Sequence, residues 1–343
     1  MGQVARIIAA LPALAALAGA APAQEFTFTI HHFLGPTSLT HERYIVPWAE
    51  AVEADSGGRI AFEIFPSMSL GGRPPDLYQQ VRDGVADIVW TLPGYTPGVF
   101  PRVEVFELPN VHRGSAVATN LAIQDIYDDW IAPDFADVHP ILVHVHTGNA
   151  LHVAGRPVET MADLAGMAIR TPTRTGAWMI EEWGADPVGM PVPELPQALS
   201  RGVVQAALIP YEVALPLQIP TITDSHLERP DGVRFGTSTF LFAMNRDSYE
   251  SLPDDLRAVI DAHSGAAIAE QIGLVWDEFE PEAMAITAQS GSVGALAPEA
   301  DPPFAEAADQ VAQRWVAEME AAGIDGAGLV AAAQAAVARH SGD

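Results

Sequence analysis

The sequence predicts an α/β fold made of two doubly wound α/β domains, and three observations along its 343 residues lead to this prediction. Strand and helix patterns alternate up to residue 90, and a second alternation occupies residues 151–209. A later strand pattern at 235–245 is expected to return to the first sheet. Repeated strand–helix–strand units form parallel or mixed sheets covered by helices, so this order of segments indicates the fold class.

The first domain is predicted from segments that follow one another as strand, helix, strand, helix and strand. Residues 26–32 (FTFTIHH) are rich in β-formers, and residues 38–54 carry apolar side chains at helical spacing before Gly57-Gly58. The full series is 26–32, 38–54, 59–65, 75–82 and 86–90. A helix near 116–130 and an apolar strand at 140–146 follow.

The rest of the chain is predicted to connect two domains, which this length permits because domains contain roughly 100–200 residues. An almost uninterrupted helical pattern at 253–289 is long enough to pack on both domains and to act as their spine. Two Ala-rich amphipathic helices are expected at 303–320 and 327–340. Residues 24–147 with 236–270 are assigned to the first domain, and residues 148–235 with 271–343 to the second.

The first 23 residues have the pattern of a secretory signal peptide. Arg6 precedes an apolar run at 7–18, and Ala21-Pro22-Ala23 matches a small-residue cleavage site. The mature chain is therefore expected to begin near Gln24, in the periplasm and without stable membrane insertion. An uncleaved anchor is the alternative, but the apolar run is shorter than the roughly 20 residues that a bilayer span needs.

The composition excludes several kinds of chemistry. The chain contains no cysteine, so disulfides, thiol catalysis and Fe–S ligation are excluded. All 17 positively charged residues are arginine, which excludes Schiff-base lysines and the phosphate-binding lysine of P-loops. A net charge of -27 repels nucleic acids and anionic membranes, so no nucleic-acid partner is expected.

Arg170 is the leading candidate for a binding residue. It follows the apolar strand pattern at 167–169 and precedes a Thr-Pro-Thr turn. Ligands of open α/β sheets bind outside the carboxyl ends of the strands. A guanidinium group there can pair with a carboxylate through two parallel hydrogen bonds, which lysine cannot do. The alternative is a structural ion pair with an acidic residue, and Arg174 nearby is expected to be a surface residue of the next helix.

Six further candidates stand at or just after predicted strand ends. Histidine side chains could donate to a second ligand oxygen, aromatic rings could cover an apolar ligand body, and a carboxylate could accept a hydrogen bond or bind an ammonium group. These candidates are His31, His32, Trp90, Tyr95, Tyr211 and Glu212. The alternatives are loop pairing for the histidines, core packing for Trp90 and helix capping for Glu212.

Neither a metal site nor a catalytic centre is predicted. His144, His146 and His152 resemble a metal cluster, but no cysteine or carboxylate accompanies them at matched spacing. The chain has no G-x-S-x-G, H-E-x-x-H or S-x-x-K motif and no nucleophilic cysteine. A protein that is not an enzyme and carries no cofactor is therefore expected, with a secreted hydrolase as the alternative.

Several separated segments, in their order along the chain, carry a family resemblance. They are 57–60 (GGRI), 65–66, 70–72, 80–87 (QVRDGVAD), 106–109 (FELP), 163–170 (DLAGMAIR), 184–187 (GADP), 190–191 with Glu194, and 198–204 (ALSRGVV). Together they resemble the solute-binding proteins of tripartite ATP-independent periplasmic (TRAP) transporters, of the C4-dicarboxylate-binding (DctP-like) type. The resemblance covers nearly the whole chain after residue 23.

This resemblance implies a periplasmic binding protein-like fold, in which two α/β domains joined by crossing strands and a long helix close on a solute in the cleft. It implies that Arg170 holds the carboxylate of a small organic acid, which is then delivered to TRAP membrane permease subunits. A ligand-loaded adaptor for a membrane sensor is the alternative with the same fold.

Two departures from the family pattern bear on the ligand. Many members have a second arginine where this chain has Ala150, beside Asn149, which is therefore a further candidate contact. Their Gln-Glu-Asn loop is replaced by Ala207-Leu208-Ile209. Because polar contacts are missing, a monocarboxylate with an apolar or aromatic part is favoured over a dicarboxylate.

Overall fold

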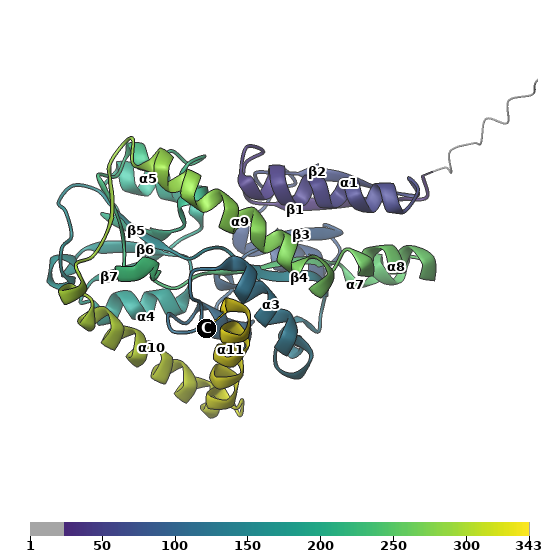
Figure 1. Ribbon diagram of the computed structural model, residues 1–343. Coiled ribbons are helices and arrows are strands. Elements are labelled where there is room, and N and C mark those ends of the chain that lie inside the picture. Colours follow the sequence, from purple (N-terminus) through teal and green to yellow (C-terminus); the bar gives the residue numbers. More distant parts are fainter. Residues whose placement is uncertain (1–23, 343) are drawn as a thin grey trace, which may run out of the picture.

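The computed structural model describes residues 24–342 and contains two mixed β-sheets with helices on their faces (Figure 1). This arrangement confirms the predicted α/β class. The predicted signal peptide at 1–23 lies outside the described residues. No helix in the described part of the chain is both long and apolar enough to cross a membrane.

The first sheet has five strands in the order β2-β1-β3-β10-β4. Its strands are β1 (Phe26–His32), β2 (Ile60–Phe65), β3 (Ile88–Thr91), β4 (His139–Val145) and β10 (Thr239–Met244). The first three run parallel, and β10 pairs antiparallel with β3 and β4, which confirms that the later strand returns to this sheet. Its helices are α1 (Val46–Asp55), α2 (Leu77–Arg82), α3 (Ala116–Ile126), α7 (Arg246–Glu250) and α8 (Asp254–Ala262).

The second sheet has six strands in the order β11-β9-β5-β8-β6-β7. They are β5 (Ala150–Val153), β6 (Ala168–Thr171), β7 (Asp186–Gly189), β8 (Ala206–Ile209), β9 (Ser225–Glu228) and β11 (Ser292–Ala295). Its helices α4 (Arg174–Glu182), α5 (Leu195–Ser200) and α6 (Tyr211–Ala214) follow β6, β7 and β8. The carboxyl ends of β6 and β8 point in the same direction because these two strands are parallel.

The chain passes between the two sheets through two neighbouring segments, which connect β4 to β5 and β9 to β10. The Asn149 amide donates to Gly236 O (2.8 Å), and the Phe235 amide donates to Asn149 O (2.9 Å). Gly148 has a φ of +111°, and a Cβ at this position would lie only 2.6 Å from the Cβ of Arg234. The predicted domain boundaries at 147/148 and 235/236 fall in these segments and stay predictions.

The nearly uninterrupted helical pattern expected at 253–289 is divided into two helices. The chain forms α8 and then α9 (Ala266–Thr287), with a break at Gly265, whose φ of 56° and ψ of -131° lie outside the helical region. The Gly265 amide donates to Ile141 O in β4 (2.7 Å), so the break is held against the first sheet. Helix α9 alone still crosses from one domain to the other (Figure 1), since its 22 residues span about 33 Å.

The two predicted C-terminal helices are present as α10 (Pro302–Ala321) and α11 (Gly326–Ser341). Helix α11 packs on α3, beside the first sheet, and α10 packs on α4, beside the second. This helical pair therefore bridges the two halves of the molecule away from the crossing strands.

Candidate functional site

A cavity of about 380 Å³ lies between the two sheets. Residues at or just beyond the carboxyl ends of β3 and β6 line it, together with residues near the start of β10. Most of the lining is apolar, and the polar residues among it are Thr40, Tyr95, His146, Asn149, Arg170, Glu212 and Ser238. This composition suits a small ligand with one charged group.

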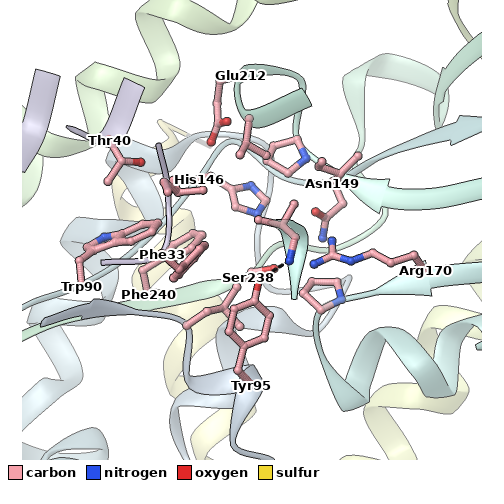
Figure 2. A pocket seen from close by; sticks show the side chains of 17 residues that line it. Phe33, Thr40, Trp90, Tyr95, His146, Asn149, Arg170, Glu212, Ser238 and Phe240 are labelled. Carbon is pink, nitrogen blue, oxygen red and sulfur yellow. Dashed lines mark hydrogen bonds between the residues drawn. The ribbon is translucent and has the colours of Figure 1, made fainter. Parts of the chain in front are cut away.

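Arg170 lies at one side of this cavity and is only 2% exposed (Figure 2). Its Nε and Nη2 donate to Met190 O (3.1 and 3.0 Å), and its Nη1 donates to Leu208 O (3.0 Å). Within residues 24–342 no carboxylate forms an ion pair with it, so the alternative of a structural ion pair is not observed. Burial lowers the pKa of Arg170, but a guanidinium remains charged at neutral pH.

The carbonyl contacts fix the guanidinium without neutralising it. A guanidinium has five N–H donors, and three of them are used by Met190 and Leu208, so one N–H on each terminal nitrogen is not bound by these carbonyls. The Tyr95 hydroxyl lies within hydrogen-bonding reach of the guanidinium. A buried cation without a partner is unfavourable by several kcal/mol or so. The site is therefore suited to an anion, and a carboxylate matches the two remaining donors.

Tyr95 approaches Arg170 from the other half of the molecule. Its hydroxyl oxygen accepts a hydrogen bond from the Val192 amide (2.9 Å), so it joins the two sides of the cleft. Burial raises the pKa of Tyr95, with the nearby Arg170 opposing the shift, so the phenol keeps its proton. Since its oxygen already accepts from Val192, the hydroxyl proton can be donated to a ligand oxygen.

Two more polar side chains lie close to the guanidinium. Figure 2 shows the amide of Asn149 beside Arg170, and its Oδ1 is buried without a hydrogen-bond partner among the described residues. His146 Nδ1 accepts from the Gly148 amide (2.8 Å), and burial lowers its pKa well below the usual value. The neutral ring therefore carries its proton on Nε2, where it is a further donor.

Aromatic rings form the opposite wall. Trp90 stacks on Phe240 with ring centroids 4.6 Å apart, and Phe33 lies 5.0 Å from Trp90. Trp90 Nε1 donates to His144 Nε2 (2.9 Å), which fixes the indole where it lines the cavity. Trp90 thus has both of the roles considered from the sequence, since it is packed in the core and also lines the cavity.

Glu212 is the only carboxylate in the described lining. Its Oε1 accepts from Trp276 Nε1 (2.8 Å), and burial raises its pKa to about 8, with a smaller contribution from Glu280. The group is therefore neutral at pH 7, which removes the repulsion that an ionised carboxylate would exert on an anionic ligand.

Three predicted site residues do not line this cavity. His31 Nδ1 contacts Gln80 Oε1 (2.8 Å) and His32 Nε2 contacts His41 Nδ1 (3.0 Å), so both rings are engaged inside the first domain. Tyr211 packs below Arg234, whose Cζ lies 5.5 Å from the ring centroid. The histidines belong to β1 itself, whereas Phe33, the first residue after the strand, lines the cavity.

The structure also adds residues that were not predicted. Phe33, Thr40, His146, Ser238 and Phe240 line the cavity together with the predicted Arg170, Trp90, Tyr95, Asn149 and Glu212. Within residues 24–342 no group of three His, Asp or Glu side chains is arranged to hold a metal ion. Instead, His144 accepts from Trp90, and His152 Nδ1 contacts His226 Nδ1 (2.8 Å).

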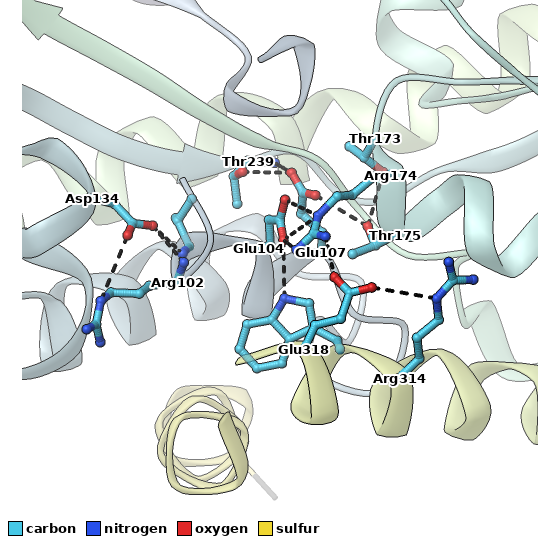
Figure 3. A network of polar contacts seen from close by, with 12 residues as sticks. Arg102, Glu104, Glu107, Asp134, Thr173, Arg174, Thr175, Thr239, Arg314 and Glu318 are labelled. Atoms are coloured by element: carbon cyan, nitrogen blue, oxygen red, sulfur yellow. Dashed lines mark hydrogen bonds and ion pairs between the residues drawn. The ribbon is translucent and has the colours of Figure 1, made fainter. Parts of the chain in front are cut away.

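Arg174 is not the surface residue that was expected. It donates to both oxygens of Glu104 (2.7 and 2.9 Å from Nε) and to Glu318 in α10 (2.6 Å), as Figure 3 shows. Next to this cluster, Thr175 Oγ1 donates to the buried Glu107, which also accepts from Thr239. These contacts tie the first turn of α4, directly after Arg170 and its turn, to the other half of the molecule.

Comparison with known proteins gives a consistent result. The family model described as bacterial extracellular solute-binding protein, family 7, matches residues 30–319. A TRAP solute binding protein from a marine metagenome, specific for aromatic acid ligands and crystallised with 3-hydroxybenzoate, is 38% identical. The match covers 93% of this chain and 99% of that one, with a TM-score of 0.90.

Two further relatives cover most of the chain. A TRAP solute binding protein from Rhodoferax ferrireducens, in complex with copurified benzoate, is 38% identical, covers 92% of this chain and 98% of its own, and has a TM-score of 0.88. The outer membrane transporter protein TsaT of Comamonas testosteroni is 25% identical over 91% of this chain and 92% of its own length.

Proposed function

The chain belongs to family 7 of the bacterial extracellular solute-binding proteins, and we propose that it is the receptor of a TRAP transporter for small aromatic monocarboxylates. One observation is the main support for this ligand class. A buried guanidinium, with no carboxylate partner among residues 24–342, lies at one side of a cavity whose opposite wall is aromatic. The two relatives at 38% identity that bind 3-hydroxybenzoate and benzoate support the same class.

In the proposed complex the ligand carboxylate pairs with the two remaining N–H groups of Arg170. Tyr95 and His146 Nε2 are the further donors, and the Asn149 amide lies beside the guanidinium. The ring lies against Trp90 and Phe240. A dicarboxylate would place a second charge in an apolar region that holds no second arginine, which disfavours that ligand class.

The two relatives at 38% identity are solute-binding proteins, and we propose that this chain likewise binds its ligand without transforming it. Residues 1–23 would direct export to the periplasm and be removed there. The loaded protein would then dock on the membrane permease subunits of the transporter. Loss of uptake of the acid after gene deletion, with no loss of a ligand-dependent transcriptional response, would distinguish transport from sensing.

Calorimetry on the chain from Gln24 onward tests the ligand class and the role of Arg170. Benzoate and 3-hydroxybenzoate are expected to bind with a Kd in the micromolar range or below, about -8 kcal/mol or more favourable, and succinate much more weakly. Arg170→Ala should weaken benzoate binding by at least about 30-fold, because one member of a buried charged pair is lost. Arg201→Ala, an exposed arginine, is the control. Equal binding by Arg170→Ala, or a preference for succinate, would overturn the proposal.

A further inference from the structure

The cavity has a second polar side, away from Arg170. Figure 2 shows Thr40 and Glu212 at the part of the cavity away from the guanidinium, with the carboxyl group of Glu212 directed inward. Both residues line the cavity and are almost fully buried, with 3% and 6% of their surface exposed. An apolar acid that contacts only Arg170 and the aromatic wall would leave these two side chains without ligand contacts.

The hydrogen bonds of Glu212 define what it can offer. Oε1 accepts from Trp276 Nε1 (2.8 Å), and Trp276 is fixed in the core at 1% exposure. No described residue pairs with Oε2 or with the Thr40 hydroxyl. Burial keeps the carboxyl protonated at neutral pH, with its pKa raised to about 8. Because Oε1 is already an acceptor, the proton is carried by Oε2 and can be donated into the cavity.

We propose that Glu212 and Thr40 recognise an uncharged hydroxyl group on the ring of the bound acid, at a position remote from its carboxylate. The hydroxyl oxygen accepts from Glu212, and its proton is donated to Thr40 Oγ1. An ammonium group is disfavoured because a neutral carboxyl cannot compensate its charge. This inference rests on the proposed function, in which Arg170 holds the carboxylate and thereby orients the ring toward Glu212.

Matched ligands test this specificity in calorimetry at pH 7. We expect 3-hydroxybenzoate or 4-hydroxybenzoate to bind about 10- to 100-fold more tightly than benzoate, since burying unpaired donors and acceptors is unfavourable. In 2-hydroxybenzoate the hydroxyl lies beside the carboxylate, so this isomer should bind like benzoate. Equal affinities of the wild-type protein for benzoate and for both remote isomers would overturn the inference.

Variants at the two residues complete the test. Glu212→Met, which has a similar size, should abolish the preference for the hydroxylated acid over benzoate, measured as the ratio of the two Kd values. Glu212→Gln should retain most of the preference, because an amide can both accept from Trp276 and donate to the ligand. If circular dichroism shows that Glu212→Met is misfolded, Thr40→Val serves instead and should reduce the preference several-fold. A full preference in the folded variant would contradict the inference.

Failure of this inference can be separated from failure of the proposed function. If Arg170→Ala loses benzoate and all hydroxybenzoates together, the carboxylate site is correct whatever the hydroxyl preference. If Arg170→Ala binds all these acids as well as the wild type, the proposed function itself is wrong.

Discussion

Arg170 is positioned by backbone carbonyls rather than by an acidic side chain. Met190 O and Leu208 O hold the guanidinium at the cavity and leave its charge for a ligand. This arrangement explains how a chain with a net charge of -27 can bind an anion, because the site supplies a local positive charge that no acidic side chain among residues 24–342 pairs with. The two remaining N–H groups also make binding depend on guanidinium geometry.

Arg170→Lys tests this geometric requirement separately from charge. Lysine keeps the positive charge but cannot donate to both carbonyls and to two carboxylate oxygens in the same plane. We expect the Kd for benzoate to rise by at least about tenfold, corresponding to roughly 1.4 kcal/mol, in calorimetry at constant pH. Arg201→Lys, on the surface, should have no effect. Wild-type affinity in Arg170→Lys would show that charge alone suffices.

The sequence pattern marks the charged part of the candidate site more clearly than its apolar part. A lone arginine after an apolar strand is a distinct signal, whereas Phe33 and Phe240 have the same pattern as core residues. His31 and His32 are the last residues of β1 and were therefore candidates for the site. Pairing of His31 with Phe65 and Val89 places them inside the sheet. Which residues lie beyond the strand end depends on register, which the sequence alone does not define.

At the scale of elements, the crossing segments determine how the two halves meet. Backbone hydrogen bonds join Asn149 to Gly236 and Phe235, and Gly148 lies where a side chain would collide with Arg234. The break between α8 and α9 was not predicted, although Gly265 was visible in the pattern. A glycine inside a helix is often tolerated, and the contact to Ile141 that favours the break comes from the folded structure.

Gly148→Ala should destabilise the protein much more than a comparable substitution elsewhere. Its φ of +111° is unfavourable for alanine by about 1–3 kcal/mol, and the added Cβ would also lie 2.6 Å from the Cβ of Arg234. Gly155→Ala is the matched control, because Gly155 has a φ of +87° with no atom within 4 Å of the added Cβ. Denaturant unfolding should show a clearly larger loss for Gly148→Ala. Equal losses would mean that the crossing segment adjusts freely.

The ion-pair cluster around Arg174 connects α4 to the first domain and to α10 (Figure 3). Glu104 is 5% exposed and also accepts from Trp315 Nε1 (3.3 Å), so its charge depends on Arg174 for compensation. The cluster follows directly on the Arg170 strand and its turn. These ion pairs therefore stabilise the position of the turn that follows Arg170.

Arg174→Met should leave Glu104 buried without its cation. Breaking a buried pair costs about 3–5 kcal/mol, and the lower end applies here because the Arg174 side chain is 22% exposed. The double variant Arg174→Met/Glu104→Gln should lose less stability than the sum of the single variants in denaturant unfolding. Arg314→Met, at an arginine whose side chain is 45% exposed, is expected to cost less than about 1 kcal/mol. If the stability loss of the double variant equals the sum of the losses of the two single variants, Arg174 and Glu104 do not interact.

At the scale of the whole molecule, buried carboxyl groups and buried histidines have opposite effects on the free energy of unfolding as the pH changes. Burial raises the pKa of Glu107 and Glu212 to about 8 and that of Asp134 to about 7. Burial lowers the pKa of His144 and His152 to about 3. Both sets are therefore uncharged in the folded protein near pH 6, whereas the unfolded chain has ionised carboxylates and begins to protonate its histidines below pH 6.5.

The ligand-free protein is consequently expected to be most stable near pH 6.5 and to lose stability on both sides. Below this pH the carboxyl groups favour the folded state, but burial lowers the pKa of six histidines, and these outweigh the carboxyl groups, so stability falls with acid. The six are His32, His112, His144, His146, His152 and His226. Above pH 6.5 the carboxylates of the unfolded chain are ionised, whereas Glu107, Glu212 and Asp134 keep their protons in the folded protein. The free energy of unfolding therefore falls until the pH passes about 8. Each such group changes the free energy of unfolding by about 1.4 kcal/mol per pH unit. Urea unfolding from pH 4.5 to 9 measures this profile. Glu107→Gln should make the alkaline decline shallower and the acid decline steeper, because the contribution of Glu107 extends from about pH 4.5 to about pH 8. A stability that stays constant or rises between pH 6.5 and 8 would show that these carboxyl groups are ionised in the folded protein.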